Sequence, residues 1–184
     1  MKKLLLLTGL LALLAGCGDA PPKGANGVVY KSAVQYNDYI VNRQTTLVKR
    51  ILEFGKIAGD DLDSAARYLS TIEKEAAVML EELKGMPPYK KDSALRDAAI
   101  RSFTFYRRVL GDDYRRIIGA GQRPGASPEA AEKEINGIVE GLSAEEDKLD
   151  KAFQQAQRNF ADRHNMRLKE NSIQKQVDRE LKEQ

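Results

Sequence analysis

Residues 62–83, LDSAARYLSTIEKEAAVMLEEL, carry the clearest structural signal of the chain. Apolar side chains recur there at alternating steps of three and four residues, at Leu62, Ala65, Leu69, Ile72, Ala76, Met79 and Leu83. This spacing puts them on one face of an α-helix, as in the seam that helix bundles bury. Asp60 or Asp61 can cap the start of the helix, and Gly85-Met86-Pro87-Pro88 can end it. The segment therefore predicts one helix of a bundle.

Three other segments show the same amphipathic pattern. Helices are expected from about Ser32 to Ile57, from Asp92 or Ser93 to Gly119, and from Ser127 past Phe160. No run alternates apolar and polar residues with the density of Val, Ile and Thr that strands require. Four amphipathic helices with short connections favour an all-α, antiparallel up-down four-helix bundle over residues 28–160.

The helical pattern of the fourth segment continues beyond the end of the predicted bundle. Of the 24 residues in 161–184, 11 are Asp, Glu, Lys or Arg. We predict an extended, polar, helical C-terminal segment that projects past the bundle or frays. A thin apolar stripe at Ile173, Val177 and Leu181 offers the alternative that it docks on a partner.

The chain begins with the pattern of an export signal. Lys2 and Lys3 precede an apolar run, Leu4 to Leu14, whose 11 residues are too few for the ~20 that a membrane-spanning helix needs. Leu14-Ala15-Gly16-Cys17 then resembles the bacterial lipobox, in which a peptidase cuts before the cysteine. The resemblance implies a signal peptide over 1–16 and a Cys17 that carries a diacylglyceryl thioether and an acylated amino group, with fatty acids such as palmitate. The alternative is an ordinary cleaved signal followed by an incidental cysteine.

Lipidation at Cys17 would attach the protein to a membrane, which is therefore its first expected partner. Residues 17–27, rich in Gly, Pro and Ala, are predicted to be a flexible tether. Cys17 is the only cysteine, so no disulfide is expected. Loss of Lys2 and Lys3 lowers the formal net charge from +3 to +1, which gives no reason to expect a nucleic-acid partner. Asp19 follows Cys17 one place later than an inner-membrane retention signal would, so outer-membrane delivery is expected.

The sequence shows no motif that is typical of catalysis or metal binding. His164 is the only histidine, which excludes paired Glu-x-x-His motifs, and it is expected to be exposed on the last helix. A nucleophile next to a base is not evident, nor is a phosphate-binding loop. We therefore predict no catalytic residue, no metal and no cofactor apart from the covalent lipid.

A polar layer across the core is one candidate site. Counted along the helices from the end opposite the tether, Gln44, Ser102 and Glu145 fall at similar height, and Arg43 could pair with Glu145 or Glu146. Such a layer would either fix the register of the helices or line a small polar pocket. Gly137 and Gly141, a Gly-x-x-x-Gly motif, predict close packing or a local bend.

Tyrosines are the second candidate site. Tyr36 and Tyr39 share one helix face, and Tyr106 lies on the third helix. Tyrosine is enriched at interfaces because it offers apolar area together with a hydroxyl group. These side chains could form an interaction surface or line a ligand cleft; the alternative is that they belong to the core or its boundary.

Three short runs carry a family resemblance: Tyr36-Asn37-Asp38-Tyr39-Ile40-Val41, Phe105-Tyr106, and Asp113-Tyr114-Arg115-Arg116-Ile117-Ile118. Together with the lipobox they resemble a family of small helical bacterial surface lipoproteins of unknown function. The resemblance implies an envelope location and a helical bundle, and it supplies no catalytic residues. The expected function is thus a non-enzymatic binding or scaffolding module that holds another envelope protein, and the alternative is a small-ligand carrier with a cleft between helices.

Overall fold

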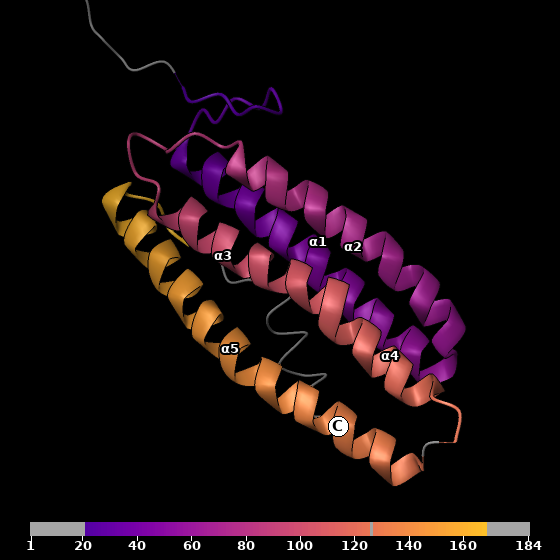
Figure 1. The fold of residues 1–184 in the computed structure, drawn as a ribbon. Helices are drawn as coiled ribbons and strands as arrows, with labels where there is room; N and C mark the ends of the chain where they lie inside the picture. The colour runs from indigo at the N-terminus through magenta and orange to yellow at the C-terminus, as the bar shows by residue number, and fades with distance from the viewer. Residues whose placement is uncertain (1–20, 126, 169–184) are drawn as a thin grey trace, which may run out of the picture.

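The computed structural model describes residues 21–125 and 127–168, and over these residues the protein is an all-α helical bundle. Its helices run up and down in chain order (Figure 1), as the sequence predicted. They are α1 (Ala33–Asp60), α2 (Leu62–Lys84), α3 (Ala94–Arg108), the π-helix η1 (Val109–Asp113), α4 (Tyr114–Gln122) and α5 (Pro128–Arg163). Within the described ranges, no helix is both long and apolar enough to cross a membrane.

A single residue joins the first two helices. The backbone N–H of Asp61 donates to the carbonyl of Ile57 at 2.8 Å, while its side chain accepts from the N–H of Asp63 at 3.0 Å. Asp61 thereby closes α1 and caps α2. The first helix consequently runs three residues beyond the Ile57 expected from the sequence.

The third helical segment, α3–η1–α4, contains a five-residue π-helical turn. Apolar positions Tyr106, Leu110, Tyr114 and Ile118 follow one another in steps of four. In an α-helix each such step rotates a side chain about 40° away from its predecessor. The wider turn of η1 takes up part of this rotation, so Leu110 and Ile118 are both buried. A π-turn of this kind is rare and is often found at functional sites.

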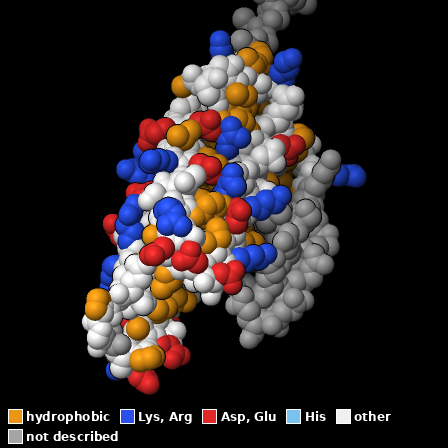
Figure 2. Space-filling view, turned by 90° about the vertical axis from the view of Figure 1, so that its right-hand side faces the viewer, with side chains coloured by type: hydrophobic (Ala, Val, Ile, Leu, Met, Phe, Trp, Pro, Cys, Tyr) orange, Lys and Arg blue, Asp and Glu red, His pale blue; other side chains and the backbone are white. Residues whose placement is uncertain are grey.

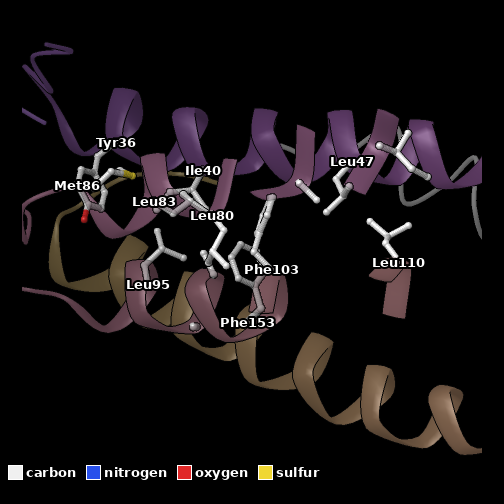
Figure 3. Packing of buried hydrophobic residues seen from close by; sticks show 14 of the residues in the cluster. Tyr36, Ile40, Leu47, Leu80, Leu83, Met86, Leu95, Phe103, Leu110 and Phe153 are labelled. Carbon is white, nitrogen blue, oxygen red and sulfur yellow. The ribbon is translucent and has the colours of Figure 1, made fainter. Parts of the chain in front are cut away.

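The core is filled along the axis of α1, α2 and α3–η1. Figure 3 shows Tyr36 and Met86 near one end of this core and Leu47 and Leu110 toward the other, with Phe153 entering from α5. The predicted seam of α2 is confirmed at five of its positions, since Ala65, Leu69, Ile72, Ala76 and Leu83 are all buried.

The helix α5 joins this core only near its end. Its buried residues are Phe153, Phe160 and Ala161, and none of residues 128–152 is buried. The amphipathic pattern predicted along this helix suggested a buried face, but Ile135, Ile138 and Leu142 are only half-buried. The first two-thirds of α5 therefore cover α3–η1–α4 from outside the core (Figure 1).

The end of α5 corrects two predictions. Asn165 has φ +51°, and the N–H of Met166 donates to the carbonyl of Ala161 at 3.0 Å. This Schellman motif stops the helix at Arg163 and folds Met166 back against the core. The predicted C-terminal helix thus does not continue unbroken through 161–184, and residues 169–184 lie outside the described ranges. His164, expected to be exposed, is instead largely buried beside Asp92.

The predicted tether is partly folded. Lys23 pairs with Val29 in an isolated antiparallel bridge, and the N–H of Ala25 donates to the carbonyl of Gly85 at 3.1 Å. Tyr30, the last residue of this segment, is buried against Tyr36. Residues 21–27 are therefore docked on the bundle instead of forming a free linker, and only 17–20 of the predicted tether lie outside the described residues.

Candidate functional site

An open cleft of about 640 Å³ lies between η1–α4 and the early part of α5. We call it the α5 cleft. Three basic, three acidic, three apolar and two glycine residues line it: Arg108, Asp113, Arg116, Ala130, Lys133, Glu134, Gly137, Ile138, Gly141, Leu142 and Glu145. The cleft exists because α5 stands off the core over this stretch.

The floor of the α5 cleft is set by the π-turn. Asp113, the last residue of η1, is only 8% exposed although it is charged. Its carboxylate faces two guanidinium groups, that of Arg108 at 3.2 Å and that of Arg116 at 3.6 Å. Arg108 also donates to Glu145 of α5 at 2.5 Å, so one arginine links the π-turn to the opposite wall. Buried charge is thus neutralised by an ion-pair network that spans the cleft.

The α5 wall carries the Gly-x-x-x-Gly motif. A Cβ atom added at Gly137 or Gly141 would meet nothing within 4 Å, so the close packing predicted for this motif is wrong within the described residues. The two glycines instead keep the cleft wide. Lys133 has no carboxylate partner in the described structure, whereas Glu134 is paired with Arg123 at 3.0 Å. One free ammonium and a strip of bare backbone are therefore available to a bound molecule.

Two tyrosines of α3–η1–α4 contact neighbouring helices near the α5 cleft. The hydroxyl of Tyr106 donates to Glu146 at 2.8 Å, and Tyr114 stacks on Phe54 of α1 with 4.9 Å between ring centroids. Burial raises the pKa of Tyr106 well above its usual range, and burial raises that of Tyr114 to about 12. Both phenols therefore remain neutral hydrogen-bonding groups at physiological pH.

The structure does not bring the predicted polar layer together. Ser102 is buried and donates to the carbonyl of Ala98 in its own helix at 3.3 Å, while Glu145 is exposed and pairs with Arg108. Gln44 lies half-buried on α1. The register set by the Tyr106–Glu146 contact places Glu145 about a turn away from Ser102. Arg43 pairs with Glu82 of α2 at 2.6 Å and not with Glu145 or Glu146.

The predicted tyrosine surface is also divided. Tyr36 is fully buried and donates to the carbonyl of Pro87 at 2.9 Å, so it cannot line an open cleft. Tyr39 is half-buried and accepts hydrogen bonds from Asn26 at 2.5 Å and from Arg43 at 3.1 Å. Tyr106 lies on α3, beside the α5 cleft. The interpretation of these three residues as core and boundary tyrosines is the one that the contacts favour.

A polar cluster that the sequence did not reveal closes the opposite end of the bundle. Asp92 forms an ion pair with Arg163, with 3.3 Å between the charged atoms, and lies 3.2 Å from Nε2 of His164. His164 contacts the rings of Tyr89 and Phe160, with centroid separations of 5.0 and 4.5 Å. The only sequence signal for this position was Asn165, a residue that tolerates the left-handed conformation needed after a helix.

Other predicted site residues cannot be placed. Cys17, Ile173, Val177 and Leu181 all lie outside the described residues. In the described part of the chain, no three His, Cys, Asp or Glu side chains are grouped so that they could hold a metal ion. The face of the molecule seen in Figure 2 mixes hydrophobic side chains with acids and bases.

Comparison of the chain with models of protein families, with curated proteins and with solved structures gives no match. The resemblance to small bacterial surface lipoproteins, which depends on short motifs, therefore stays a prediction.

Proposed function

We propose that this protein is a membrane-anchored bacterial lipoprotein whose helical bundle is a non-enzymatic binding module of the cell envelope, most simply on the outer membrane. The observation that carries the proposal is the run Leu14-Ala15-Gly16-Cys17 after a short apolar segment. The folded segment that begins at Pro21 supports it, since processing before Cys17 would leave the bundle intact and close to its anchor.

The anchor is tested by expressing the full chain in a bacterium and determining the mass of the mature N-terminal peptide. The expected product begins at Cys17 and carries both thioether-linked diacylglycerol and an acylated amino group. Cys17→Ser is the control, and it should lose the acyl mass and remain unprocessed. A wild-type product that is cut elsewhere or lacks acyl chains would refute the proposal. Separation of the two membranes by density then tests the outer-membrane assignment.

The binding role is supported by the composition of the α5 cleft. Its open shape and its balance of three cations and three carboxylates suit a protein segment that presents both charges and small apolar side chains. Such a lining differs from the mostly apolar, enclosed pockets that bury small molecules.

A photo-crosslinking residue tests this use of the cleft in intact envelopes. It is placed at Ile138, which lines the cleft, or at the adjacent Val139, which is 47% exposed but does not line it. A partner held in the cleft should give crosslinked species from position 138 and few from position 139. Equal crosslinking from the two positions, or none from position 138, would contradict a partner in the cleft.

A small-ligand carrier remains the second candidate, because about 640 Å³ falls within the usual range of ligand sites. The same experiment separates the two functions. A carrier would shift the mass of the position-138 product by the mass of a small molecule, whereas a protein partner would shift it by the mass of a second chain.

A further inference from the structure

One end of the bundle is rich in cations that have no acidic partner. This tether end consists of residues 21–32, the α2–α3 loop 85–93 and residues 163–168, which Figure 1 shows together where the helices begin and end. Its exposed basic residues without a carboxylate partner in the described structure are Lys23, Lys31, Lys90, Lys91 and Arg167. Nearby exposed acids without a basic partner are Asp38 and Asp162. The free charge of the tether end is thus clearly positive.

The two central lysines occupy an unusual turn. Tyr89 and Asp92 exchange backbone hydrogen bonds of 3.0 and 2.8 Å, which leaves Lys90 and Lys91 as the two residues of a tight turn. Both have positive φ, +48° and +69°. Turns of this kind favour Asn-Gly because L side chains are strained there, and strained backbone tends to persist at functional sites. The lysine pair therefore strains the backbone, and it places two ammonium groups at the tip of the loop.

The base of this turn is held rigidly. Tyr89 is buried between Tyr36 and Phe160, with centroid separations of 5.4 and 5.8 Å. Asp92, on the other side of the turn, is bound by Arg163 and His164. The positions of Lys90 and Lys91 are thus defined by the core and by the end of α5.

The docked N-terminal segment brings these cations to a membrane if Cys17 is acylated. Pro21 follows Cys17 by four positions, and even a fully extended chain would span only about 14 Å over that distance. The opposite end of the bundle carries Asp60, Asp61 and Asp63 around the α1–α2 turn. A negatively charged surface would attract the tether end and repel the opposite end.

We propose that the tether end binds the anionic headgroups of phospholipids and so fixes the orientation of the bundle on its membrane. This inference rests on the proposed lipid anchor. A basic side chain close to an anionic membrane strengthens binding by about fivefold. The four lysines of this end therefore add an electrostatic contact to the lipid anchor. This contact weakens as ionic strength rises, whereas the lipid anchor is insensitive to ionic strength.

The test uses the mature, full-length protein on vesicles of phosphatidylcholine and on vesicles of equal parts phosphatidylcholine and phosphatidylglycerol. A water-soluble amine reagent labels exposed lysines, and mass spectrometry reads each site. We expect Lys90 and Lys91 to be labelled several-fold more slowly on phosphatidylglycerol, with the protection lost at high salt. Lys49 and Lys56, which are exposed on α1 away from the tether end, should not change. The proposal would be overturned if Lys90 and Lys91 were labelled at the same rate on both kinds of vesicle. It would also be overturned if Lys49 and Lys56 were protected as strongly as Lys90 and Lys91.

Two variants sharpen the result. Lys90→Gln with Lys91→Gln should abolish the dependence of Lys23 and Lys31 protection on phosphatidylglycerol, whereas the charge-matched Lys49→Gln with Lys56→Gln should leave it intact. Unchanged protection in the first variant would also contradict the inference. The mass of the N-terminal peptide is determined on the same samples. If Cys17 is unacylated, the anchor fails, and cosedimentation of that protein with the two kinds of vesicle then decides headgroup binding separately.

Discussion

Two neighbouring tyrosines in the core differ in what their hydroxyl groups contact. The rings of Tyr30 and Tyr36 lie 5.2 Å apart. The hydroxyl of Tyr36 donates to the carbonyl of Pro87, whereas that of Tyr30 is buried without a hydrogen-bond partner among the described residues. Tyr36→Phe should lower the free energy of unfolding by about 1 kcal/mol because it leaves a buried carbonyl unpaired. Tyr30→Phe is the matched control and should be neutral or stabilising. Thermal unfolding of both variants checks this, and an equal loss in both would contradict it.

The turn at Lys90 and Lys91 gives a second prediction at this scale. Lys90→Asn with Lys91→Gly installs the pair that positive φ favours, and should raise the melting temperature by about 2–4 °C for a gain near 1 kcal/mol. The Gln-Gln variant of the same positions removes the same charges but retains the strained side chains, so its melting temperature should not rise. Calorimetry of both variants separates strain from charge, and a similar rise in both would show that charge repulsion was responsible.

Single residues also show where prediction from the sequence stopped. Spacing alone identified buried seam residues of α2 such as Leu69 and Ile72, because helical periodicity reports which side chains share a face. It could not show that Arg43 pairs with Glu82 or that His164 meets Asp92, since such contacts depend on how far one helix slides along another. A shift of one turn was enough to separate Ser102 from Glu145.

At the scale of elements, the end of α5 depends on one residue. Asn165 holds the left-handed conformation that closes the Schellman motif. Asn165→Ala should destabilise the protein by about 1 kcal/mol, because Cβ is poorly tolerated there, whereas Asn165→Gly should be neutral or stabilising. Circular dichroism during heating measures both. If the alanine variant were as stable as the wild type, the motif would not control where α5 ends.

The glycines of α5 give the second prediction at this scale. No neighbouring atom restricts a Cβ at Gly137 or Gly141, so replacing both by Ala should add about 2 kcal/mol of stability through helix propensity alone. Gly85→Ala should do the opposite, because its Cβ would lie 2.9 Å from that of Ala25 in the docked segment. Denaturant unfolding measures the three changes. A stable double-alanine variant that no longer crosslinks from Ile138 would further show that a partner uses the bare backbone.

The element pattern explains which helices were predicted well. The strict three-and-four spacing of α2 is typical of a seam between packed helices, and the predicted and observed elements agree closely. The four-residue spacing of α3–η1–α4 was compatible with a drifting α-helix, so the π-turn could not be recognised beforehand. The apolar stripe of α5 is real, but a stripe cannot reveal how far a helix stands from its neighbours.

At the scale of the whole molecule, buried phenols couple stability to alkaline pH. Burial raises the pKa of Tyr30 and of Tyr114 to about 12 from 10.0, and raises those of Tyr36 and Tyr106 further. Folding therefore favours the neutral form, and this contribution is fully present below pH 10 and is lost as the pH rises through 12. The melting temperature should fall steeply between these values, together with the appearance of tyrosinate absorbance. In Tyr30→Phe the fall should be shallower, and an unchanged slope would mean that Tyr30 ionises freely in the folded protein.

The docked N-terminal segment has a mechanical consequence. If a membrane anchor and a bound partner were pulled apart, the load would reach the helices only through residues 21–30. The contact between Ala25 and Gly85 would be the first backbone hydrogen bond between this segment and the helices to bear it. Release of these ten residues would add up to about 35 Å of slack while leaving α1 to α5 folded. The docked segment would thus stay attached to the bundle under small forces, and it would detach and extend under larger ones.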